Sequence, residues 1–362
     1  MKVKIMLSVA IMAFVVMSCK SDDVPASLNI PIKEVFFSIE AGEKIIIINC
    51  NKEYTISSPS SWCKVSKVKS GVMTTVTANE TGQERTAIIT ITCDNLSEQI
   101  SITQSGDEFC TMRIATYNIL YQGTTWSASR KELVINLIRK YDFEIFGVQE
   151  ARLSTHLTDL TADGTYAYTG KAQGSVGHIC INAIIYKKSR FELLDAGDFW
   201  YSLTPDVSSF GWDDQESRHT CSWGKFNDKV SGREFYVFNS HLSTVNGNTR
   251  NESAKLLLSR IKSIAGDSPV FATGDFNSWP GGLAIQTILN DGLLGDAYAL
   301  TEKQPTGTEG TYNGLSDPVN RDRIDYIFVT KNIRVKEYGV INDRPGGQFP
   351  SDHDPVLVVA EF

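Results

Sequence analysis

The stretch 269-PVFATGDFN-277 begins as an apolar run and ends in two polar side chains, Asp275 and Asn277. An apolar run of this length, without strict alternation, predicts a strand that is buried on both faces, as in layered α/β domains. In such folds the strand ends and the loops that follow them are where sites are placed. The stretch therefore predicts an α/β domain with a polar site at one edge of a sheet.

The same arrangement recurs at five other places between residues 110 and 362. The other polar strand ends are Asn118 in 115-ATYN-118, Glu150 in 147-GVQE-150, His241 in 239-NSH-241, Asp325 in 323-RID-325, and Asp352 and His353 in 351-SDH-353. Helical periodicity in 129–141 and 252–264 separates the strands. Any one of these residues alone is explained by a turn, a helix cap or a satisfied core histidine. Their joint occurrence predicts one shared site.

The segment 29–106 has a different pattern. Runs rich in β-branched residues, such as 86-TAIITIT-92 and 98-EQISITQ-104, alternate with turn-forming stretches such as 79-NETGQ-83. No stretch has helical periodicity, so the pattern predicts a small all-β sandwich. The chain is thus divided into a sandwich at 29–106 and an α/β domain at 110–362.

The first residues are typical of a targeting signal. Lys2 and Lys4 precede an apolar run, 5–17, that is too short to span a bilayer. The following 16-VMSC-19 resembles a bacterial lipobox, which makes 1–18 a signal peptide, Cys19 the lipidated residue and 19–28 a tether. We expect an exported protein that is lipid-anchored to the outer membrane, and the acidic pair 22–23 favours the cell surface. The alternative is a plain secretory signal with an incidental cysteine.

Composition narrows the function classes. The chain has 362 residues, 41% of them hydrophobic, and a net charge of −7. These values are typical of a globular protein that buries hydrophobic cores. Residues 110–362 contain 25 Lys and Arg against 30 Asp and Glu, a net charge of −5. This balance argues against avid, non-specific binding of duplex nucleic acid. Besides Cys19 there are six cysteines, whose spacings favour no particular disulfide pairing and no zinc site.

Two resemblances to known families follow from these motifs. In order and spacing, the strand-end segments between Met112 and Phe362 resemble the endonuclease/exonuclease/phosphatase superfamily, which includes deoxyribonuclease I. The stretches 195-DAGDFWYSLTPDV-207 and 250-RNESAKLLLSRIKSIAG-266 are similar to an uncharacterised bacterial branch of it. This resemblance implies a four-layered α/β sandwich and metal-dependent hydrolysis of phosphoesters.

The N-terminal module resembles the BACON domain. The similarity rests on 60-SSWCKVS-66, 78-ANETGQERTAIITI-91 and 102-ITQSG-106. It implies an immunoglobulin-like module that serves as a spacer or, alternatively, binds glycans or mucin.

The resemblance and the chemistry of phosphate esters suggest a metal site. Hydrolysis needs a hard cation, an activated water and donors for the developing charge. Glu150 is the first expected ligand of Mg²⁺ or Mn²⁺, Asp352 adds a second carboxylate, and Asn118 positions the cation or the phosphate. Carboxylate oxygens are what Mg²⁺ prefers.

Proton transfer is expected from the remaining strand ends. Asp275 and Asn277 are two residues apart, so in an extended segment both side chains point the same way, one toward the attacking water and one toward a phosphate oxygen. His241 is expected to donate a proton to the phosphoryl group.

His353 needs a partner from another strand. Asp352 is its neighbour, and in an extended backbone adjacent side chains diverge. Asp325 is the expected partner, as in the family's paired aspartate and histidine, and it would fix the tautomer of the imidazole. Whether His353 acts as a base or as a charged clamp for phosphate stays open, and Asp354 is interpreted as a turn residue.

Several further residues have alternative roles. Arg218 and Arg250 resemble family arginines that contact phosphate, although surface salt bridges are an equal alternative. Cys180 stands where many relatives have a glutamate, which argues against two-metal schemes. A final group of aromatic residues, either pocket walls or rim packing, comprises Trp200, Trp212 and Trp279.

The function predicted from the sequence is a surface-anchored, metal-dependent phosphodiesterase or phosphatase with in-line attack of an activated water. Its substrate would be a nucleic acid, a nucleotide or a phospholipid head group. One alternative is a sphingomyelinase/phospholipase C-like or inositol-phosphate phosphatase activity. A second is a catalytically inactive glycan-binding surface protein, and a third is a purely structural lipoprotein.

Overall fold

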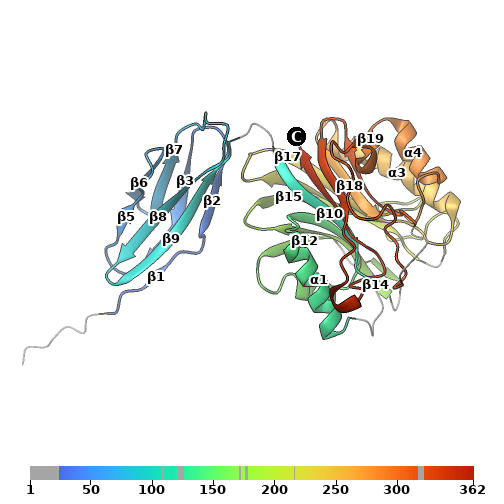
Figure 1. Ribbon diagram of the computed structural model, residues 1–362, viewed down its shortest axis with the longest axis horizontal. Helices are drawn as coiled ribbons and strands as arrows, with labels where there is room; N and C mark the ends of the chain where they lie inside the picture. Colours follow the sequence, from blue (N-terminus) through green and yellow to red (C-terminus); the bar gives the residue numbers. More distant parts are fainter. Residues whose placement is uncertain are drawn as a thin grey trace, which may run out of the picture.

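The computed structural model describes residues 24–106, 110–120, 126–170, 173–175, 178–215, 217–316 and 322–362. The predicted signal peptide and Cys19 lie outside these residues. Figure 1 shows an elongated all-β body followed by a larger α/β body. No helix in the described ranges is long and apolar enough to cross a membrane.

The N-terminal body is a β-sandwich. One sheet has the order β2(Glu34–Phe37), β9(Leu96–Gln104), β8(Arg85–Cys93), β5(Thr55–Ser57), and the other β3(Gly42–Ile47), β7(Gly71–Val76), β6(Cys63–Val68). A short ribbon pairs β1(Leu28–Asn29) with β4(Asn49–Cys50). Alternate residues of β8 and β9, such as Ile89 and Ile100, are fully buried between the sheets, which explains the β-branched alternation.

The residues that carried the BACON resemblance form a network of contacts around the buried Gln104. The Arg85 guanidinium donates to Gln104 Oε1, at 2.8 Å from Nη2, and lies over the Trp62 ring at 4.4 Å. Gln104 in turn donates to the carbonyl oxygens of Thr77 and Glu40. These side chains therefore hold the sandwich together.

Two cysteines meet in the sandwich although the sequence favoured no pairing. The Sγ atoms of Cys50 and Cys93 are 2.7 Å apart, and both residues are free thiols in this structure. Cys63, Cys110 and Cys221 are also free and are buried.

The C-terminal body contains two sheets. The first has the order β12(Tyr166–Thr169), β14(His178–Lys187), β11(Ile145–Ala151), β10(Thr111–Asn118), β22(Val356–Glu361), β21(Arg334–Val340), and β13(Gln173–Ser175) pairs with β14. The second has the order β15(Phe191–Trp200), β16(Thr220–Asp228), β17(Glu234–His241), β18(Val270–Asp275), β20(Asp325–Thr330), β19(Leu294–Asp296). The helical segments are α1(Ala128–Lys140), η1(Leu153–Leu157), α2(Thr158–Leu160), α3(Gly247–Ala265), α4(Leu283–Asp291), α5(Ala297–Leu300) and η2(Pro345–Gly347).

The sheets and helices make four layers. One core lies between the two sheets and includes Ile114 and Phe271. A second core lies between α1 and the first sheet, and a third between the α3/α4 pair and the second sheet. Figure 1 shows α1 and the α3/α4 pair on opposite sides of the domain. The predicted four-layered α/β sandwich is confirmed, and helix periodicity explains it, since each helix buries one apolar face.

Strand directions bring the polar strand ends to one edge. β17 and β18 are parallel and both end at the pair His241↔Asp275. β20 runs antiparallel to β18 and starts opposite its end, at Asp275↔Asp325. In the other sheet, β10 and β11 are parallel and end together near Asn118. The start of β10 is at the opposite edge, where the Cys110 N–H donates to the Phe362 carbonyl.

Candidate active site

Asn118 links the two sheets at the site edge. It is 1% exposed, and its Nδ2 donates to Glu150 Oε1 and to Asp275 Oδ2, each at 3.1 Å. Its oxygen accepts from the Leu120 N–H. Because one amide bonds both carboxylates, Asn118 fixes the spacing between them. A direct bond from its oxygen to a cation would have to use the second lone pair.

Glu150 stands on an irregular strand end. Its φ is +61°, and the register with β14 shifts between Val148 and Ala151. A left-handed backbone at a glutamate costs free energy and usually marks a functional position. The bulge turns this carboxylate out of the strand alternation and toward Asn118.

Asp352 lies close enough to Glu150 for their charges to interact. Burial raises the pKa of Asp352 and the Glu150 charge raises it further, while the His353 imidazole opposes both. Two partly buried carboxylates that repel each other are a fit for a hard divalent cation, which prefers oxygen ligands. The residues predicted as metal ligands are therefore brought together, with Asn118 holding Glu150 in place.

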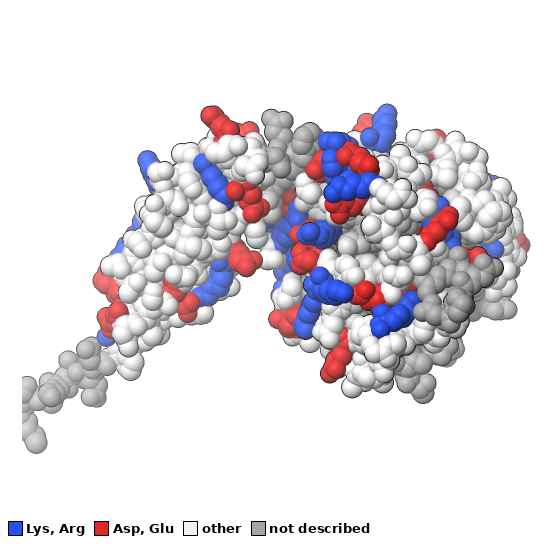
Figure 2. Space-filling model, viewed as in Figure 1, with Lys and Arg blue, Asp and Glu red and all other residues white. Residues whose placement is uncertain are grey.

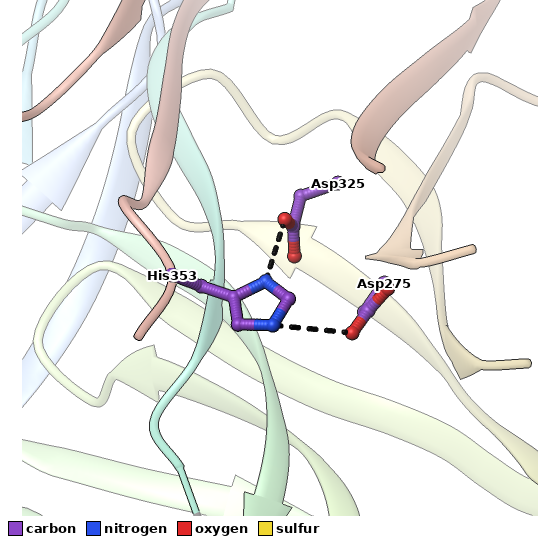
Figure 3. A group of neighbouring side chains, drawn as sticks. All are labelled: Asp275, Asp325 and His353. Atoms are coloured by element: carbon purple, nitrogen blue, oxygen red, sulfur yellow. Dashed lines mark hydrogen bonds and ion pairs between the residues drawn. The ribbon is translucent and has the colours of Figure 1, made fainter. Parts of the chain in front are cut away.

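His353 lies beside Asp325 and Asp275 (Figure 3). His353 Nδ1 lies 2.8 Å from Asp325 Oδ2, and Nε2 lies 3.7 Å from Asp275 Oδ2. Burial alone lowers the pKa of His353, but the Asp325 and Asp275 carboxylates outweigh it and raise the pKa to about 10. The structure brings together the partners expected from sequence. These three residues also offer ligand atoms within 4.8 Å of one another, although a cation there would have to displace the proton that the two carboxylates favour on His353.

His241 and Asn277 complete the edge. His241 Nε2 is 3.5 Å from Asp275 Oδ2, and its side chain is 16% exposed. Asn277 does not extend the strand as expected: β18 ends at Asp275, and Asn277 has a φ of +46°. Its Nδ2 donates to the Leu242 carbonyl at 2.9 Å, and its N–H donates to Asp275 Oδ1. The prediction that both side chains point the same way was wrong, because the chain turns immediately after Asp275.

The two arginines have different surroundings. Arg250, on α3, is half-buried and donates from Nη1 to the Ser243 carbonyl at 2.8 Å, so it supports the loop that follows His241. The Arg218 guanidinium lies 4.5 Å from the centre of the Phe210 ring. Both are placed near the end of β17 and start of β16. No described contact places Arg250 in the surface salt bridge considered as an alternative.

The tryptophans divide by exposure. Trp279 follows β18 and is 62% exposed. Trp212 packs against the core between α3 and the second sheet, and Trp200 lies at the end of β15, partly buried. Only Trp279 among the three is strongly exposed beside the site edge. The Cys180 side chain lies outside the described residues.

Sequence reasoning missed two supporting residues. Arg130 on α1 is buried and donates to the carbonyl oxygens of Ile119 and Pro350, which ties the end of β10 to the loop that carries Asp352. The Tyr312 ring lies edge-on to His353, with centroids 5.1 Å apart, and is 38% exposed. Their sequence surroundings carried no motif, because both act through contacts distant in the chain.

Asp354 was predicted as a turn residue, and this was wrong. It is 1% exposed and bonds Arg344 Nη2 at 2.6 and 2.9 Å. It also accepts from Asn313 Nδ2 at 2.9 Å. Asp354 therefore fixes the loop that carries His353 through its bonds to Arg344 and Asn313.

Comparison with known proteins agrees with this geometry. The family model described as Endonuclease/Exonuclease/phosphatase family matches residues 115–353, and the BACON model, described as a putative binding domain, matches residues 52–105. An endonuclease/exonuclease/phosphatase family protein of Bacteroides thetaiotaomicron is 32% identical, with a TM-score of 0.65, over 70% of this chain and 98% of that one.

Two further relatives have named activities. A mannosyl-6-phosphatase of Bacteroides thetaiotaomicron is 32% identical, with a TM-score of 0.64, over 69% of this chain and all of that one. Nocturnin of Drosophila melanogaster is 30% identical over 162 residues, which are 34% of this chain and only a quarter of nocturnin's length. The family match, the four layers and the shared edge of polar strand ends lead to one conclusion: the chain belongs to the endonuclease/exonuclease/phosphatase family and carries a BACON domain before its catalytic fold.

Proposed function

We propose that this protein is an exported hydrolase of phosphoester bonds that depends on Mg²⁺ or Mn²⁺ and is anchored to the outer membrane through Cys19. The observation that carries the hydrolase proposal is the Asn118 amide, which bonds Glu150 and Asp275 at once. It holds Glu150, one of the two carboxylates proposed to bind the cation, beside Asp275, which is proposed to accept the proton of the attacking water. The anchoring part rests on the lipobox-like 16-VMSC-19.

Glu150 and Asp352 would hold the cation. Bound there, it would supply positive charge for the phosphoryl oxygens in the transition state. Burial raises the pKa of Asp352 most and the Glu150 charge raises it further, and a cation bound between the two carboxylates would relieve that repulsion.

The chain's own residues would move the protons. Asp275 would orient the attacking water and accept its proton as the new bond from the water oxygen to phosphorus forms. His241 and His353, whose Nε2 atoms face the same Asp275 oxygen at 3.5 and 3.7 Å, would donate to the phosphoryl oxygens. The ester bond to phosphorus breaks on the opposite side, and the leaving oxygen takes up a proton from solvent. Asp325 would keep the His353 ring oriented.

Phosphate monoesters of sugars are the first substrate class we propose. The support is the mannosyl-6-phosphatase relative, which this chain covers over its full length. Phosphodiesters of nucleotides or RNA are the second class, supported by the partial similarity to nocturnin. Figure 2 shows Lys and Arg interspersed with Asp and Glu on the visible face. The net charge of −5 over residues 110–362 disfavours non-specific duplex binding.

The BACON domain is proposed to act as a spacer between the anchor and the catalytic fold. Its Trp62 ring lies against Arg85, and Gln104 is fully buried, so the residues that define the motif support the sandwich itself. Binding to a glycan array or to mucin by the full chain would favour the alternative role.

A substrate panel tests the hydrolase proposal. Residues 20–362 would be assayed with Mg²⁺, with and without chelator, against sugar phosphates, inositol phosphates, nucleotides, RNA, single- and double-stranded DNA, and sphingomyelin. We expect phosphate release from at least one class, lost on chelation. A protein that is folded but inactive on the whole panel would contradict the proposal and favour a catalytically inactive surface protein.

A further inference from the structure

The segment that carries His241 is held by side chains as well as by the sheet, in which His241 pairs with Asp275 and the Leu242 N–H donates to the Asp275 carbonyl. β17 ends at His241, so the three carbonyl groups from His241 to Ser243 lie at and beyond the end of the strand ladder. Each nevertheless has a side-chain donor. His219 Nδ1 lies 3.1 Å from the His241 oxygen, Asn277 Nδ2 donates to Leu242 at 2.9 Å, and Arg250 Nη1 donates to Ser243 at 2.8 Å.

His219 is the donor to the carbonyl of His241 itself. It is 9% exposed, and both of its ring nitrogens are engaged. A carbonyl oxygen only accepts, so Nδ1 must carry a proton. Nε2 lies 3.0 Å from Asp214 Oδ2, a separation that makes a hydrogen bond only if one proton lies between the two atoms.

Asp214 fixes the orientation of the His219 ring. It is 2% exposed, and its Oδ2 also accepts from Ser243 Oγ at 2.5 Å. A serine, a histidine and an aspartate thus meet here, but the Ser243 hydroxyl donates to the carboxylate and not to an imidazole. The group therefore lacks the contact that would activate a serine nucleophile.

We propose that Asp214 and His219 are positioning residues for His241: Asp214 orients His219, and His219 holds the His241 main chain so that its ring stays beside Asp275. The inference rests on the proposed function, because it assigns His241 a part in the chemistry. His241 Nε2 is buried without a hydrogen-bond partner among the described residues and lies 3.5 Å from Asp275 Oδ2, so its place depends on its backbone. A displacement of about 1 Å at a reacting group can cost about 100-fold in rate.

Two amide substitutions separate positioning from bulk stability. In His219→Asn the amide nitrogen takes roughly the place of Nδ1 and keeps a donor for the His241 carbonyl. In His219→Gln the amide reaches toward Asp214 instead and leaves that carbonyl without its donor. Both variants remove the imidazole ring. If His219 only contributed to stability, the two substitutions would therefore change kcat to the same extent.

The matched control is Tyr166→Phe. Tyr166 Oη donates to the Phe143 carbonyl at 2.7 Å and is buried, so this variant also removes a buried bond from a side chain to a carbonyl. Phe143 lies just before β11, at the end opposite Glu150. We expect its melting temperature to fall and its kcat to stay at the wild-type value.

The measurement is kcat and KM for residues 20–362 on whichever panel substrate is hydrolysed. We expect His219→Gln to lose about 10- to 100-fold in kcat with KM within about 3-fold, and His219→Asn to recover most of that loss. Equal kcat in the two variants, or wild-type kcat in His219→Gln, would overturn the inference while leaving the proposed function intact.

A second measurement, by NMR, does not need enzyme activity and applies even if the wild-type protein hydrolyses no substrate of the panel. Long-range ¹H–¹⁵N spectra of the imidazoles should show a His219 Nδ1 that carries a proton, together with His241 ring resonances that shift in His219→Gln more than in His219→Asn. A His219 ring protonated only on Nε2 would overturn the inference whatever the enzyme assays give.

Discussion

The contact of Asn118 with two carboxylates leads to a prediction about charge. Asn118→Asp would place a third carboxylate about 3.1 Å from oxygens of Glu150 and Asp275. At an effective dielectric constant of about 20, each such contact costs about 5 kcal/mol. That exceeds the cost of protonating a carboxyl group at pH 7, about 4 kcal/mol, so the cluster should take up a proton and the destabilisation should level off near that figure.

The assay is thermal unfolding of residues 20–362 without divalent cations. For a domain of this size a loss of about 4 kcal/mol lowers the melting temperature of the C-terminal transition by about 8–16 °C. The isosteric control, Asn118→Leu, loses the two donors but adds no charge, so it should be more stable than Asn118→Asp at pH 7.

The direction of this pKa shift fixes how the stability of Asn118→Asp changes with pH. The cluster raises a carboxyl pKa in the folded state of Asn118→Asp, so the deficit grows as pH rises above about 4 and shrinks as pH falls from 7 to 5. Adding Mg²⁺ or Mn²⁺ should stabilise Asn118→Asp more than wild type, since a cation relieves the extra charge. An Asn118→Asp protein as stable as wild type without metal would refute the reasoning, because the carboxylates would then not share one site.

Three further predictions concern the scaffold. Asp354→Ala should destabilise the C-terminal domain by about 3–5 kcal/mol in denaturant unfolding, because it leaves the Arg344 guanidinium buried without this partner; a loss under 1 kcal/mol would contradict the contact. Burial alone would raise the pKa of Asp228, but the neighbouring guanidinium of Arg190 outweighs it and lowers the pKa. The stability that this pair contributes should be present above about pH 4 and lost below it. In Asp228→Asn the free energy of unfolding should therefore depend less on pH in that acidic range. Finally, Cys50 and Cys93 should be recovered as a linked peptide pair after air oxidation and non-reducing digestion, and both should label with a thiol reagent after reduction.

The sequence predicted the fold and most of the site because both depend on short-range patterns. Apolar strands that end in a polar residue, such as those ending in Asp275 and His241, need only strand geometry and the convergence of strand ends at one edge. The pairing of Asp325 with His353 followed from the alternation that turns neighbouring side chains apart, together with the family resemblance.

What the sequence did not predict depends on backbone irregularities or on distant partners. The left-handed φ of Asn277 reverses the direction that alternation gave it, although a turn was an alternative for 274-GDFN-277, whose Gly, Asp and Asn favour turns. Asp354 looked like a turn residue because its partner Arg344 lies ten residues away on a different loop. Arg130 and His219 act by bonding main-chain carbonyl groups, and any sequence offers those groups at every position.

The measurement that tests the central claim most directly is phosphate release by residues 20–362 from mannose 6-phosphate and the rest of the panel. Wild type would be compared with Glu150→Gln and His353→Ala, with and without chelator. The proposal predicts activity that is abolished by chelation, restored by Mg²⁺ or Mn²⁺, and reduced at least about 100-fold in both variants. Activity that survives chelation, or full activity in His353→Ala, would contradict it.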